Sequence, residues 1–86
     1  MSGPGRRHGR RSGFPLTMAN PGEPLTVADI RGGRGMRQHL TDMGIAPGVT
    51  LTMMNGPGRG VIVKIMGTRI ALAPGMARRV MVRKSE

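Results

Sequence analysis

The chain has 86 residues, with 14 Lys and Arg against 4 Asp and Glu, a formal net charge of +10, and no Cys. A chain this short encloses a thin core, which argues against a large internal active-site cavity and favours a binding function. Without Cys there are no disulfides, thiolate metal ligands or thiol nucleophiles. The sequence contains no run of about eighteen apolar residues, and its basic start lacks the apolar segment of a secretory signal, so we expect a cytoplasmic protein.

The first thirteen residues differ in composition from the rest. They carry Arg6, Arg7, Arg10 and Arg11 with no acid, and Met1 is their one apolar residue. Such a segment cannot bury enough apolar surface to offset the entropy lost on ordering. We therefore predict a disordered basic Gly/Arg-rich tail at 1–13 and a folded domain at 14–84.

The first elements of that domain are a strand and a helix. The segment PLTVADI at 24–30 alternates apolar and polar residues and ends at two glycines, which predicts a strand. Met36, Leu40 and Met43 then recur at i, i+4 and i+7, the spacing of one helical stripe. Gly44 follows as a helix-ending glycine, so a helix of about two turns is predicted.

Three more apolar runs follow, separated by glycines. They are VTLTMM at 49–54, GVIVKIM at 60–66 and TRIALA at 68–73, and each alternates like a half-buried strand. A single turn at 74–79 and a short strand at 80–82 complete the domain. About five short antiparallel strands with one short helix after the first predict a mainly β, SH3-like barrel.

Nine methionines supply much of the apolar surface, in a chain with one Phe and no Trp or Tyr. Most methionines fall at periodic apolar positions, where filling of the core is the expected role. Met54, Met66 and Met81 alternate outward from their strands. They form either an adaptable apolar patch for a partner or a surface covered by the helix.

Several segments, taken together and in order, resemble the FeoA family. These are LTDMGIAPG at 40–48, RIAL at 69–72 and GMARRVMV at 75–82, and the resemblance runs from about Pro15 to Val82. It implies a small cytoplasmic accessory or regulatory protein that works with FeoB, a membrane permease with a GTP-binding domain, in ferrous iron uptake. The basic tail is not part of the usual family pattern.

The partner-binding surface expected from this reading is the outer face of the helix with the neighbouring loop. It comprises Arg37, His39, Asp42 and, in the loop NGPGRG at 55–60, Arg59. The protein would then lie peripherally at the inner membrane through its partner. Outward methionines and exposed strand edges are equally compatible with a homo-oligomer.

Few residues in the sequence are suited to metal binding or catalysis. His39 and Asp42 can share one helical face, but two ligands from a short helix do not complete a coordination sphere. They are weak candidates for transition-metal binding, and no other cofactor is expected. With no Cys, two His and four scattered acids, we expect the protein not to be an enzyme.

The alternative function is that of a basic nucleic-acid-binding SH3-like module or a metal-responsive regulatory domain. The charge of +10 favours contact with phosphates, whereas the lack of aromatic residues for base stacking argues against it. A similar SH3-like module occurs in metal-responsive repressors, so the barrel does not fix the function. The arginines of the tail could also contact an anionic membrane surface.

Overall fold

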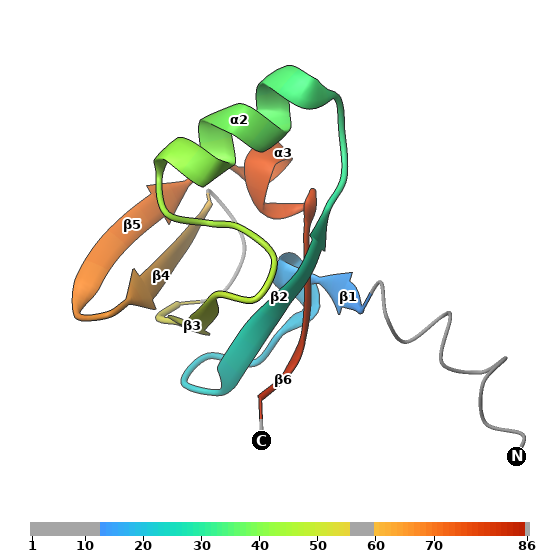
Figure 1. Cartoon of the computed structure of the whole chain (residues 1–86). Coiled ribbons are helices and arrows are strands. Elements are labelled where there is room, and N and C mark those ends of the chain that lie inside the picture. Colours follow the sequence, from blue (N-terminus) through green and yellow to red (C-terminus); the bar gives the residue numbers. More distant parts are fainter. Residues whose placement is uncertain (1–12, 56–59, 86) are drawn as a thin grey trace, which may run out of the picture.

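A computed structural model describes residues 13–55 and 60–85. Within these residues, six strands and three short helical segments follow one another (Figure 1). In chain order they are β1 (Phe14–Pro15), the 3₁₀ helix η1 (Leu16–Met18), β2 (Pro24–Ile30), α2 (Arg34–Asp42), β3 (Thr50–Met53), β4 (Val61–Ile65), β5 (Thr68–Leu72), α3 (Pro74–Ala77) and β6 (Val80–Lys84). The predicted strand at 24–30 matches β2, and the predicted helix corresponds to α2.

The six strands form one strongly bent sheet in the order β1-β6-β2-β3-β4-β5, and every neighbouring pair is antiparallel. The mainly β architecture predicted from the sequence is confirmed, with one strand more than the five expected. The additional strand is β1, in which Phe14 pairs with Val82 and Pro15 with Met81. A two-residue strand that ends in proline has too few positions to show alternation, so its sequence carries no strand signal.

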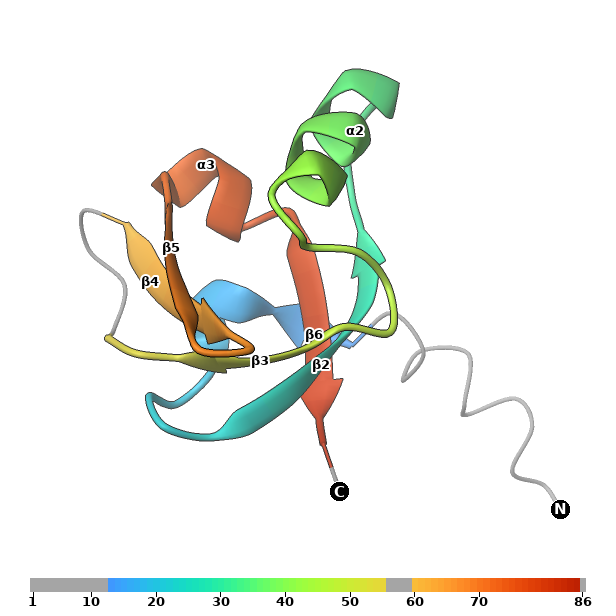
Figure 2. The ribbon, with the colours of Figure 1, turned by 60° about the vertical axis from the view of Figure 1, so that its left-hand side comes forward.

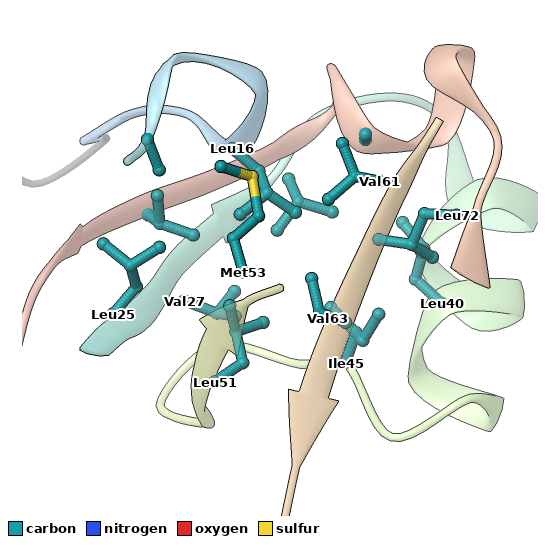
Figure 3. Packing of buried hydrophobic residues seen from close by; sticks show 14 of the residues in the cluster. Leu16, Leu25, Val27, Leu40, Ile45, Leu51, Met53, Val61, Val63 and Leu72 are labelled. Carbon is teal, nitrogen blue, oxygen red and sulfur yellow. The ribbon is translucent and has the colours of Figure 1, made fainter. Parts of the chain in front are cut away.

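The core lies inside the bend of the sheet and is wholly aliphatic. Figure 3 shows Leu16 of η1, Met53 of β3 and Val61 of β4 pointing toward one another, with Leu40 of α2 and Leu72 of β5 closing one end. Within the described ranges no polar or charged residue is buried. The hydrophobic effect and close packing therefore hold the domain together without any buried polar network.

Both longer helices cover the same end of the sheet, as Figures 1 and 2 show from two directions. The end of α2 is fixed by Gly44, which has φ +92° and follows the capping residue Met43. The N–H of Ile45 donates to the carbonyl of Leu40, and the N–H of Gly44 donates to that of Thr41. This is a Schellman motif, and its apolar contact joins the two fully buried residues Leu40 and Ile45.

A two-residue turn joins β4 to β5. Ile65 pairs with Thr68, and the intervening Met66 and Gly67 have φ of +50° and +85°. Positive φ at both central positions defines a type I′ turn, in which Asn or Gly is the usual first residue. Met66 holds that position with 96% of its surface exposed, so the turn places an apolar side chain in a backbone conformation that most residues avoid.

The methionines divide as predicted, with one exception. Met53 is fully buried, and Met36, Met43 and Met76 pack against the core. Met54 and Met66 are exposed as expected. Met81 lies outside the core cluster, as its outward alternation predicts, but it is 6% exposed and so adds nothing to an exposed apolar patch. Strand β6 has a neighbour on each side, so Met81 lies between Pro15 of β1 and Asp29 of β2.

Candidate functional site

The inner stripe of α2 packs against the rest of the domain, and its outer face is exposed. Leu40 is fully buried and Met36 is half-buried against the core, whereas Arg37, Gln38, His39, Thr41 and Asp42 are exposed. The helix therefore presents a polar surface opposite its buried stripe. That arrangement suits recognition of another macromolecule, because the buried stripe fixes where the exposed side chains lie.

Arg37 connects this helix to the neighbouring strand. Its Nη2 lies 3.7 Å from Oδ1 of Asp29 on β2, and the two side chains are 53% and 44% exposed. Oδ1 of Asp29 also accepts a hydrogen bond of 2.8 Å from the N–H of Ile30. An ion pair this exposed contributes roughly 0–1 kcal/mol, so it orients Arg37 more than it stabilises the fold.

Asp42 interacts within the helix. Its Oδ1 accepts a hydrogen bond of 2.9 Å from Nε2 of Gln38, one turn earlier. Gln38 was not among the predicted site residues, although its i, i+4 spacing from Asp42 is a recognisable sequence signal for such a pair. Asp29 was likewise missed, and no local signal could identify it, because the crossing of β2 and α2 brings it to Arg37.

The structure places the predicted site residues on one helix but not at one point. A helix turns by about 100° per residue, so Arg37 and His39 lie about 200° apart on opposite flanks, with Gln38 and Asp42 between them. Their side chains frame the outer surface of α2 and do not converge. Arg59 lies outside the described residues.

The geometry does not assemble a metal site in the described part of the chain. No group of three or more His, Asp or Glu residues lies close enough to hold an ion within residues 13–55 and 60–85. His39 and Asp42 remain two ligands on one exposed helix, which is fewer than a stable transition-metal site uses. None of the helices in these ranges combines the length and apolarity needed to cross a membrane.

The relatives of this chain cover nearly all of the folded domain. The sequence model of the FeoA domain matches residues 14–84. A protein described as putative Fe(2+) transport protein A, from Methanocaldococcus jannaschii, is 36% identical over 73 residues, which are 85% of this chain and 89% of the relative. The match therefore spans most of both proteins and is not confined to a shared fragment.

Solved structures show the same fold. A crystal structure of an iron uptake regulatory protein, FeoA, superimposes with a TM-score of 0.77 at 40% identity, covering 84% of this chain and 97% of that one. A manganese-dependent transcriptional repressor in complex with manganese gives a TM-score of 0.75 at 21% identity, over 83% of this chain and 36% of the repressor. The second likeness is one of fold alone. The SH3-like architecture is confirmed, and the chain belongs to the FeoA family.

Proposed function

We propose that the protein is a cytoplasmic, non-catalytic accessory of ferrous iron uptake that acts by direct contact with the FeoB permease. The observation that carries this proposal is the match of residues 14–84 to the FeoA domain. A relative described as a putative Fe(2+) transport protein supports it, because the match covers 89% of that protein. The size of the domain and its aliphatic core also suit a binding module better than a catalyst.

The proposed contact surface is the exposed face of α2 together with Arg59. Arg37, His39 and Asp42 supply donors and an acceptor on a helix whose opposite face is buried. The ion pair between Arg37 and Asp29 limits the freedom of that arginine before a partner arrives. A side chain already restrained loses less conformational entropy on binding.

The first test is titration of the ¹⁵N-labelled chain with the GTP-binding domain of its own FeoB at near-physiological salt. We expect the largest amide shifts at residues 34–42, and at least a fivefold loss of affinity for His39→Ala combined with Asp42→Ala. Arg59→Ala tests the loop in the same assay. Arg83→Ala, an exposed position on β6, is the control and should bind like the wild type.

Nucleic-acid binding is the competing function, since the net charge of +10 favours phosphate contact. Duplex DNA replaces the permease domain in a parallel titration. The accessory role would be rejected by two results together. The chain would bind DNA tightly and in a salt-sensitive way, and the permease domain would leave the α2 resonances unchanged.

A further inference from the structure

Strand β5 forms a free edge of the sheet. It stands last in the strand order and pairs with β4 alone. Among the described residues, no backbone hydrogen bond joins Thr68–Leu72 to any segment other than β4. Figure 1 shows β5 at the outside of the sheet, with the strands of the barrel on one side of it. Such an edge exposes backbone donors and acceptors to any extended chain of matching chemistry.

The register identifies which backbone groups are free. The N–H of Met54 donates to the carbonyl of Ile62 over 2.6 Å, and the N–H of Ile62 donates to Oδ1 of Asn55 over 3.1 Å, so Ile62 turns its backbone groups toward β3. Ile62 pairs with Ala71. In an antiparallel ladder that pair is therefore not hydrogen bonded, and the N–H and C=O of Ala71 face the free edge. The same holds two residues earlier, at Arg69.

Beside Ala71 the outer surface of the sheet is apolar and hollowed. Ile62 of β4 lies directly across from Ala71, and the exposed Met54 extends the same row on the other side of Ile62. A hollow of about 350 Å³ lies here, with Asn55, Ile62, Ala71 and Ala73 among its lining residues. Because alanine fills little space, the hollow can receive an apolar side chain from a neighbouring strand.

The next row along the strands is cationic. Lys64 and Arg69 face each other across β4 and β5, and both are exposed. Like charges directly opposite one another destabilise a sheet. Within the described residues neither cation forms a salt bridge, since Asp29 pairs with Arg37 and Glu23 with Lys84, while Asp42 accepts from Gln38. An incoming carboxylate would relieve the repulsion between Lys64 and Arg69.

We propose that the β5 edge binds an extended, acidic segment of a partner protein by strand addition. Antiparallel pairing places one side chain of the segment in the hollow beside Ala71 and the side chain two residues later beside Arg69 and Lys64. The two positions are about 6.8 Å apart along a strand. The recognised pattern is therefore an apolar residue, any residue, then Asp or Glu. A second copy of this chain is a poor occupant, because its own Arg69 would approach the same cations.

The test uses the full-length chain and a fluorescein-labelled octapeptide, Thr-Thr-Ile-Thr-Glu-Thr-Thr-Gly, compared with versions that carry Gln or Lys in place of Glu. In low salt we expect the Glu peptide to bind at least fivefold more tightly than the Gln peptide and the Lys peptide to bind least. Amide shifts should fall on residues 68–73 and 61–64. Shifts on residues 34–42 instead would overturn the proposal.

Two variants separate edge pairing from general charge attraction. Ala71→Pro removes an N–H that faces the free edge while leaving the β4 ladder intact, a position where proline is tolerated, and should weaken the Glu peptide at least tenfold. Arg69→Glu should reverse the peptide preference, so that the Lys peptide binds more tightly than the Glu peptide. This variant still tests the proposal if Ala71→Pro does not fold. The control, Arg83→Glu, makes the same charge change on β6 and should keep the wild-type preference.

The remaining outcomes decide against strand addition. Strand addition is rejected if a folded Ala71→Pro variant binds the Glu peptide as tightly as the wild type does. It is also rejected if the wild type binds the Glu and Gln peptides equally. A dimer in sedimentation that Ala71→Pro dissolves would assign the edge to a second copy. The proposed contact of α2 with the permease is tested independently, because its variants lie on another surface.

Discussion

Two regions of the molecule differ in how their charged side chains are paired. On the side of β2, α2 and β6, the acids have internal partners: Asp29 meets Arg37, Glu23 lies 3.5 Å from Lys84, and Asp42 accepts from Gln38. The β4–β5 hairpin has Lys64 opposite Arg69 and the exposed Met66 at its turn. The two ion pairs of the first arrangement are partly exposed, and each contributes roughly 0–1 kcal/mol. The like charges of Lys64 and Arg69 destabilise the hairpin. This cost points to the hairpin as a surface for a partner.

Loss of the core contact under α2 should give the largest effect. Leu40 is fully buried, and its truncation in Leu40→Ala leaves a cavity between the helix and the sheet. We expect the free energy of unfolding to fall by about 2–5 kcal/mol in urea denaturation. The neighbouring exposed substitution Thr41→Ala should change it by less than about 0.5 kcal/mol. Equal effects of the two changes would mean that α2 is not anchored by its apolar stripe.

The glycine that ends α2 comes next. Gly44 has φ +92°, so Gly44→Ala forces a side chain into left-handed backbone and should cost about 1–2 kcal/mol by thermal unfolding. Gly35 lies within the same helix with open space around it and without a positive φ. Gly35→Ala should therefore be neutral or stabilising by up to about 1 kcal/mol. A similar loss at both positions would contradict the Schellman geometry.

The turn of the hairpin should be open to improvement. Met66→Asn places a residue suited to left-handed backbone at φ +50° and should raise the free energy of unfolding by about 0.5–1 kcal/mol. Met18 is 72% exposed and has no positive φ, so Met18→Asn is the matched control and should give no such gain. Absence of a difference between the two would remove the strain assigned to the turn.

The smallest effect compares the same charge reversal at the two ends of the sheet. Lys64→Glu replaces a repulsive cross-strand pair with an attractive one and should stabilise by about 0.2–1 kcal/mol at low salt. Lys84→Glu places a carboxylate beside Glu23 and should destabilise by a similar small amount. Both variants change the net charge equally, so the difference between them reports local pairing. It should shrink in 1 M NaCl.

Most of the fold could be predicted from the sequence, because the periodicity of apolar residues and the turn-forming residues act locally. Strand β2 has the predicted bounds, Gly44 ends the helix as predicted, and Met53 fills the core. The burial of Met81 could not be predicted, because it depends on β1 lying beside β6. The exposure of Arg37, His39 and Asp42 followed from the helical period. Their separation across the helix and the partner of Arg37 depend on tertiary geometry, which no local pattern contains.

The pairing of β1 with β6 determines when the domain can be completed. Phe14 and Val82 lie 68 positions apart in sequence (82 minus 14), yet they face each other in the sheet. Ribosomes add about 5–20 residues per second, so Phe14 must wait several seconds for its partner. Strand β2 also finds its neighbour β6 only at the end of the chain. The sheet is therefore completed only after synthesis has passed β6, and until then β2 remains without that neighbour.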